Sequence, residues 1–195
     1  MNLPNKLTLL RIILAPMFIA SLLINFPMHY LVSGVLFGIA SITDTLDGRI
    51  ARKRNLVTDF GKFADPLADK ILVISALVCF LQLGLLGNYG AIPVIILLFR
   101  EFAVSGIRLV AASSGKVVAA NIWGKIKTVS QMISISAIFA MQVVLEFINI
   151  FKITIVGLDN IFFIIGNILV WIFTLFTIIS GIIYIMDNSK FLKDM

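Results

Sequence analysis

Apolar runs long enough to cross a lipid bilayer, which takes roughly 18–20 residues of α-helix, recur along this whole chain. The run from Ile161 to Met186 is an example, and polar residues do not alternate with apolar ones in it. A transmembrane β-barrel would need such alternation. Because 60% of the residues are also hydrophobic, the sequence predicts an all-α, polytopic membrane protein.

Six transmembrane helices are expected, in one compact domain that covers residues 1–195. The expected spans are 7–26, 30–51, 62–87, 91–112, 124–148 and 158–186. The first run contains Arg11 and lacks a small-residue cleavage site, so we expect a span and not a removable signal peptide. The apolar part of the third span is short, so its helix is expected to begin earlier, in the polar sequence GKFADPLAD.

Lys and Arg residues show a strong asymmetry between the two ends of these spans. With six spans, every Lys and Arg except Lys152 approaches the same side of the membrane. Since cytoplasmic connections carry the excess of basic residues, both termini are predicted to be cytoplasmic. The net charge of +6 is confined to helix ends on that face. Anionic lipid headgroups are therefore the expected partners, and nucleic-acid binding is not expected.

Four aspartates flank the connection between the second and third spans. Asp44 and Asp47 lie roughly 60° apart on one helix, and Asp65 and Asp69 lie roughly 40° apart on the next. Each helix therefore presents a pair of carboxylates. Two facing pairs would need compensating cations, and oxygen ligands favour Mg²⁺, Mn²⁺ or Ca²⁺. The alternative is a solvated charged rim, in which the aspartates pair with nearby basic residues: Arg49, Arg52, Lys53 and Lys70.

Small residues and an arginine accompany these carboxylates. Gly48 follows Asp47 directly, and Gly61 lies one turn before Asp65. Glycine lets a ligand approach the backbone closely. Ala51 and Arg52 lie one further turn along the second helix, where the guanidinium could bind a phosphate. Together these residues predict a phosphate or pyrophosphate site.

The complete pattern resembles the signature of the CDP-alcohol phosphatidyltransferase family: Asp44-x2-Asp47-Gly48-x2-Ala51-Arg52-x8-Gly61-x3-Asp65-x3-Asp69. The resemblance implies a bacterial inner or plasma membrane enzyme with a cytosol-facing active site, and a homodimer. It implies that a CDP-linked lipid binds at the aspartates, with two divalent cations, Mg²⁺ or Mn²⁺, holding its pyrophosphate. An alcohol would attack the phosphorus that bears the lipid, and CMP would leave.

The resemblance also implies roles for individual residues. Asp44, Asp47 and Asp65 would hold one cation, and Asp44, Asp65 and Asp69 would hold the other. Asp69 would also be the general base for the acceptor hydroxyl. The pocket for the cytidine diphosphate would be formed by Gly48, Ala51, Arg52 and Gly61.

Two further segments, NLPNKLTLLRIILAP and REFAVSGIRLVAASSGKVVAANIWGKIKTVSQ, resemble the family's bacterial phosphatidylglycerophosphate synthase branch. That branch implies transfer from CDP-diacylglycerol to sn-glycerol 3-phosphate. Serine, an inositol phosphate or phosphatidylglycerol remains an alternative acceptor. A small cation transporter is a remote alternative, because the halves of the spans opposite the aspartates are almost wholly apolar.

An anionic acceptor suits the basic residues at the cytosolic ends of the fourth and fifth spans. Arg108 and Lys125 are predicted to bind it, and Thr8 and Arg11 are candidate contacts in the first span. The other interpretation of Arg11 is that it snorkels to the surface. Lys116 and Lys127 could equally reflect only the positive-inside rule. Arg100 could form a structural pair with Glu101.

Overall fold

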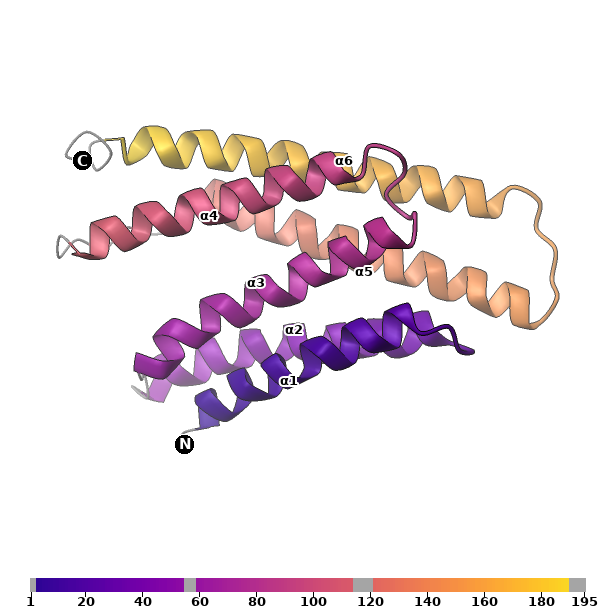
Figure 1. The fold of residues 1–195 in the computed structure, drawn as a ribbon, viewed down its shortest axis with the longest axis horizontal. Helices are drawn as coiled ribbons and strands as arrows, with labels where there is room; N and C mark the ends of the chain where they lie inside the picture. The colour runs from indigo at the N-terminus through magenta and orange to yellow at the C-terminus, as the bar shows by residue number, and fades with distance from the viewer. Residues whose placement is uncertain (1–2, 55–58, 114–120, 190–195) are drawn as a thin grey trace. The chain divides into compact units, whose positions relative to one another are not determined.

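Six α-helices make up the part of the chain that the computed structural model describes, residues 3–54, 59–113 and 121–189. In chain order they are α1 (Leu3–Leu23), α2 (His29–Arg54), α3 (Asp59–Gln82), α4 (Ala91–Ser113), α5 (Ile122–Ile150) and α6 (Leu158–Asp187) (Figure 1). Side chains are described within residues 5–44, 67–68, 70–112 and 121–189. The all-α prediction is confirmed, and each helix overlaps one predicted span.

The third helix shows how local sequence sets a boundary. As predicted, α3 starts well before its apolar part, at Asp59. It ends at Gln82, before the predicted end of the span at residue 87. The reason lies in Gly84 and Gly87, whose φ angles of 73° and 67° belong to the left-handed region and cannot continue a right-handed helix.

Three helices are long and apolar enough to cross a membrane by length and composition, in the part of the chain described. They contain the segments Asn5–Leu23, Ile122–Ile150 and Leu158–Asp187. α4 carries Arg100, Glu101 and Arg108, and the apolar helical segment of α3 extends only from Lys70 to Gln82. Charge within α4 and the short apolar part of α3 therefore weaken their hydropathy signal. The count of six spans stays a prediction.

Contacts divide the chain into two units, which are described separately. The first unit contains Met1–Leu83 and Phe139–Val156, and the second contains Gly84–Ile138 and Gly157–Met195. The prediction of a single domain stays a prediction. In the first unit α1 packs against both α2 and α3 (Figure 1). Arg11 contacts Asp44 and Ser21 contacts Ser33, so α1 and α2 run antiparallel.

An aromatic cluster forms the centre of the first unit. The rings of Phe18, Phe37 and Phe80 all lie close to Phe139, with centroid distances of 6.0, 5.7 and 4.9 Å. All four side chains are buried. Gly34 on α2 lies against the same Phe139 ring, where a Cβ would be 3.5 Å from it. These contacts fix α1, α2 and α3 around the last part of α5.

Side-chain contacts also define the helix directions in the second unit. Asn167 on α6 donates to the Leu85 carbonyl, and further along both helices Arg100 donates to Ser180. α4 and α6 therefore run in the same direction. Ser134 on α5 donates to the Leu169 carbonyl, whereas Gly124 lies near Ser180, so α5 runs antiparallel to α6.

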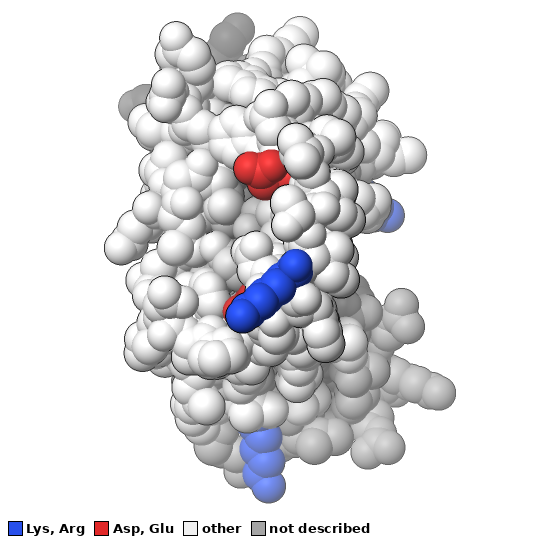
Figure 2. Space-filling model, turned by 90° about the vertical axis from the view of Figure 1, so that its right-hand side faces the viewer, with Lys and Arg blue, Asp and Glu red and all other residues white. Residues whose placement is uncertain are grey.

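Large apolar side chains cover much of the described surface. Phe99, Phe102 and Leu109 on α4 are 73%, 68% and 74% exposed. Figure 2 shows one face of the molecule, on which charged side chains are sparse among uncharged ones. A surface of this kind is stable in contact with lipid but not with water. The structure is therefore that of a helical membrane protein.

Candidate active site

The four candidate metal-binding aspartates lie on two consecutive helices of the first unit. Asp44 and Asp47 belong to the last part of α2, and Asp65 and Asp69 belong to the first part of α3. The helical spacing on which the prediction rests is therefore confirmed for both pairs. Of the four side chains only that of Asp44 falls within the described part of the structure. The predicted phosphate-binding residues are also helical, and their side chains lie outside that part: Gly48, Ala51, Arg52 and Gly61.

Asp44 contacts a buried arginine. Nη1 of Arg11 lies 2.6 Å from Oδ1 of Asp44. The Arg11 side chain is 0% exposed, whereas that of Asp44 is 39% exposed. Arg11 therefore does not snorkel to the surface, and the Asp44 side chain that it contacts is partly exposed. Whether Arg11 also contacts an acceptor stays a prediction.

The side of α1 that carries Arg11 changes from polar to apolar along the helix. Asn5, Thr8 and Arg11 are 8%, 0% and 0% exposed and follow one another at intervals of three residues. Phe18 and Leu22 continue this buried side and are fully covered. Because buried polar side chains need hydrogen-bonding or charged partners, the polar part of this side of α1 is expected to face other polar groups. It lies at the Asp44 end of the first unit, so α1 contributes to the candidate site.

The predicted protein ligands of the metal site are all carboxylate oxygens. They suit Mg²⁺ or Mn²⁺, which favour oxygen ligands. The contact with Arg11 shows that the Asp44 carboxylate takes a cationic partner. Among the described side chains, which include only Asp44 of the four aspartates, no group of three or more His, Cys, Asp and Glu residues could hold a metal ion. The residues present therefore fit the predicted cations.

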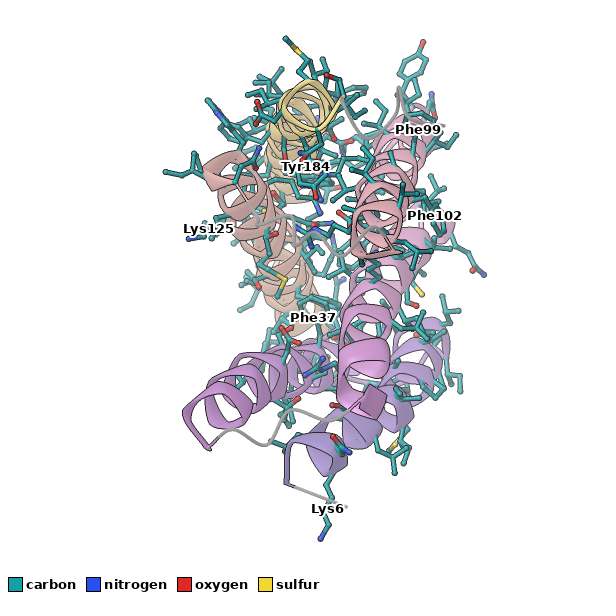
Figure 3. All side chains as sticks on the ribbon, turned by 90° about the vertical axis from the view of Figure 1, so that its left-hand side faces the viewer. Lys6, Phe37, Phe99, Phe102, Lys125 and Tyr184 are labelled. Carbon is teal, nitrogen blue, oxygen red and sulfur yellow. The ribbon has the colours of Figure 1, made fainter. Side chains whose placement is uncertain are left out.

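Arg108 and Lys125, the predicted acceptor-binding residues of the second unit, differ in their surroundings. Nε of Arg108 donates to the Tyr184 hydroxyl at 3.2 Å, and the guanidinium lies 5.6 Å from the centre of the Tyr184 ring. Tyr184 is buried. Lys125 is exposed on the outer side of α5 (Figure 3). Arg108 is thus held by α6, while the Lys125 side chain is exposed on α5.

A buried ion-pair network lies near these residues. The carboxylate oxygen Oε1 of Glu101 accepts from Nη1 of Arg100 at 2.8 Å and from Nζ of Lys127 at 2.9 Å. The predicted pairing of Arg100 with Glu101 is confirmed. The participation of Lys127 was missed by sequence reasoning. A signal for it exists, because Lys127, Gln131 and Ser134 repeat at helical spacing within a mostly apolar helix, and all three are buried.

The same part of the second unit contains buried donors that have no acceptor among the described residues. They are Nε of Arg100, Nδ2 of Asn121 and Nε2 of Gln131. A buried N–H group without an acceptor is unfavourable. Together with two cations and one carboxylate in the network, these donors make the region receptive to an anion or to another oxygen-rich ligand.

Comparison with known proteins agrees with the signature. A family model described as CDP-alcohol phosphatidyltransferase matches residues 1–180. The chain is 43% identical over 204 residues to a Bacillus subtilis (strain 168) protein named CDP-diacylglycerol–glycerol-3-phosphate 3-phosphatidyltransferase, with 98% of this chain and 97% of the relative covered.

Two further relatives carry the same name. The Rickettsia bellii protein is 38% identical over 190 residues, with 97% of each chain covered. The Haemophilus influenzae protein is 37% identical over 139 residues, with 70% of this chain and 75% of the relative covered. The similarity thus extends over nearly the full length of the chain and includes the candidate aspartates on α2 and α3.

Proposed function

This chain belongs to the CDP-alcohol phosphatidyltransferase family, and we propose that it transfers the phosphatidyl group of CDP-diacylglycerol to sn-glycerol 3-phosphate. The products are phosphatidylglycerophosphate, a phospholipid precursor, and CMP. The observation that carries this proposal is the position of Asp44, Asp47, Asp65 and Asp69 at helical spacing on two consecutive helices, within the complete family signature. The relatives' shared name supports the choice of substrates.

The four aspartates are proposed to bind two divalent cations, a class of cofactor that the family generally uses. By the family pattern, Asp44, Asp47 and Asp65 hold one cation, and Asp44, Asp65 and Asp69 hold the other. Such cations neutralise the charge of the pyrophosphate and stabilise the CMP leaving group. Gly48, Ala51, Arg52 and Gly61 are proposed to complete the pocket for the cytidine diphosphate.

Transfer itself is proposed to occur in one displacement. The acceptor's hydroxyl oxygen attacks the phosphorus that bears the diacylglycerol, and the bond from this phosphorus to the pyrophosphate bridging oxygen breaks. The electron pair leaves with CMP. Asp69 takes the hydroxyl proton as general base. Phosphoryl transfer depends mainly on positioning and charge stabilisation, which carboxylates, cations and Arg52 can supply.

Arg108, Lys125, Thr8 and Arg11 are proposed to bind the acceptor. The phosphate of glycerol 3-phosphate carries the negative charge that these basic groups attract. Support comes from the positive balance of the Arg100, Glu101 and Lys127 network and from its buried donors. Thr8 and Arg11 lie on the polar side of α1, beside Asp44.

The proposed setting is a bacterial inner or plasma membrane with six spans, both termini in the cytoplasm, and a cytosol-facing active site. Within the first unit the antiparallel contact of α1 and α2 brings Lys6, Arg11 and the basic end of α2 to the same end. Within the second unit Arg100, Arg108 and Lys125 also share one end. Basic residues at one end of each unit support the positive-inside assignment. A homodimer is proposed from the family resemblance alone.

An assay of acceptor choice tests this function. Purified protein in detergent receives CDP-diacylglycerol and Mg²⁺ or Mn²⁺, and CMP release is measured with glycerol 3-phosphate, serine, inositol phosphate and phosphatidylglycerol in parallel. We expect rapid CMP release with glycerol 3-phosphate only. Rapid release with another alcohol and none with glycerol 3-phosphate would keep the family chemistry and refute the proposed acceptor.

A further inference from the structure

Glu101 lies where three helices of the second unit meet. Its Oε1 atom accepts hydrogen bonds from Arg100 on α4 and from Lys127 on α5, and Nη2 of Arg100 donates to Ser180 on α6 at 2.8 Å. The side chains of Arg100, Glu101 and Lys127 are only 12%, 15% and 6% exposed. One carboxylate thus joins α4 to α5, and Arg100 extends the same network to α6.

Two glycines provide the space for this network. A Cβ atom on Gly181 would lie 3.2 Å from Cγ of Arg100, and one on Gly124 would lie 3.4 Å from Nη2 of Arg100. Side chains at either position would therefore crowd the guanidinium. The helices approach closely at Arg100 because both positions lack a side chain. The network is part of the helix packing and not a surface ion pair.

Loss of the Glu101 charge would leave two buried cations next to each other. A buried charge without its partner is strongly unfavourable, especially inside a membrane-spanning segment. Arg100 and Lys127 would then repel each other and separate. The contact between α4 and α5 at this level consequently depends on the Glu101 carboxylate.

The network also sets the orientation of residues further along these helices. Lys125 precedes Lys127 by two residues, so the two side chains point about 200° apart around the axis of α5. Because the helix is rigid, holding Lys127 in place also sets the direction in which Lys125 projects. Arg108 follows Arg100 by eight residues, roughly 12 Å along α4. Its partner Tyr184 follows Ser180 by one turn of α6. One alignment of α4 along α6 therefore accounts for both the Arg100–Ser180 and the Arg108–Tyr184 contact.

We propose that Glu101 is a positioning residue for acceptor recognition, which acts through Arg100 and Lys127 to hold Arg108 and Lys125 in place. This proposal rests on the proposed function, from which the phosphate of glycerol 3-phosphate follows as the ligand of Arg108 and Lys125. Glu101 itself contacts neither substrate in this proposal. Its carboxylate keeps Arg100 and Lys127 paired. It thereby holds the first turns of α5 in one orientation about the helix axis.

Kinetics of Glu101→Gln and Glu101→Asp test the effect on the acceptor. Loss of the charged hydrogen bonds in Glu101→Gln is expected to raise KM for glycerol 3-phosphate about 10-fold or more, while KM for CDP-diacylglycerol changes less than about 2-fold. Glu101→Asp keeps the charge and is expected to recover most of the loss. The matched control is Glu146→Gln in the first unit, where the carboxylate accepts from the backbone N–H groups of His29 and Tyr30. It should leave both KM values unchanged.

A distance measurement tests positioning independently of the acceptor. Spin labels are placed at Phe102 on α4 and Thr128 on α5, both exposed, in a background in which Cys79 is replaced by alanine. We expect one narrow distance distribution for the parent protein, a broad one for Glu101→Gln, and a narrow one again for Glu101→Asp. If Glu101→Gln does not fold, Lys127→Gln removes the other end of the same pair and is measured in the same way.

The possible results separate the two claims. An unchanged distance distribution in Glu101→Gln, or an equal rise of both KM values, would overturn the positioning role. Failure of the parent protein to use glycerol 3-phosphate would refute the proposed function, and the distance distributions would still decide whether Glu101 holds α4 and α5 together.

Discussion

Arg11 and Asp44 form the described contact that lies closest to the proposed chemistry. From the sequence, Arg11 could snorkel or bind a headgroup, and nothing in its spacing pointed to Asp44. The structure buries its side chain completely and brings Nη1 to 2.6 Å from the carboxylate. The polar side of α1 therefore lies beside Asp44 on α2. In the described residues this pair is also the direct evidence that Asp44 needs positive charge nearby.

Removal of the Arg11 charge should make stability depend on divalent cations. Arg11→Gln leaves the Asp44 carboxylate without its buried partner, so the free energy of unfolding should fall by about 1–3 kcal/mol in EDTA. Saturating Mg²⁺ should recover most of this loss, because a bound cation compensates the same carboxylate. The measurement is Tm in detergent with EDTA and with Mg²⁺. Lys6→Gln, at an exposed position of α1, is the control and should change neither value. Equal destabilisation of Arg11→Gln in both conditions would contradict the prediction.

At the level of the helices, the apolar runs located all six elements, and the left-handed glycines Gly84 and Gly87 explain why the third helix ends before its predicted boundary. The pairing of helices was not accessible in the same way, because hydropathy along one segment does not say which other segment covers it. Lys127 illustrates the difference. It was weighed as a cytosolic charge, whereas the structure pairs it with Glu101 on another helix. The spacing of the four aspartates was predictable, since it depends only on the helix repeat and the family signature.

From the close packing of α4 against α6, we predict that alanine substitution affects stability differently at two glycines. Gly181→Ala places a methyl group 3.2 Å from Cγ of Arg100, and such overpacking should lower the free energy of unfolding by about 1–3 kcal/mol. Gly106→Ala is the matched control, because nothing lies within 4 Å of its Cβ position. This control should leave stability unchanged or raise it by less than about 1 kcal/mol, since alanine favours helix. The check is thermal unfolding in detergent. A control that loses as much as Gly181→Ala would argue against close packing at Arg100.

For the whole molecule, the sequence predicts an asymmetry across the membrane that the separate units support. Each unit gathers basic residues at one end of its helices, and the helices alternate in direction within each unit. Both features suit a protein whose acceptor and nucleotide come from the cytosol while its lipid substrate stays in the bilayer. The acyl chains can then remain in lipid while only the headgroup enters the polar site.

Labelling of single cysteines tests this arrangement. In a background that lacks Cys79, Tyr89→Cys and Val156→Cys, which replace side chains that are 72% and 94% exposed, should react with a membrane-impermeant maleimide in spheroplasts. Lys6→Cys should react only after the membrane is opened. Reaction of all three from the same side would contradict the predicted topology.

The proposed reaction is tested most directly by the identity and amount of its lipid product. Purified, metal-stripped protein is given CDP-diacylglycerol and glycerol 3-phosphate, Mg²⁺ is added, and CMP and lipid are quantified by mass spectrometry. We predict equal amounts of CMP and phosphatidylglycerophosphate, both dependent on Mg²⁺ and on glycerol 3-phosphate, and a rate about 10²–10⁴-fold lower for Asp69→Asn. CMP release without a matching amount of phosphatidylglycerophosphate, or an equal rate in EDTA, would contradict metal-assisted phosphatidyl transfer to glycerol 3-phosphate.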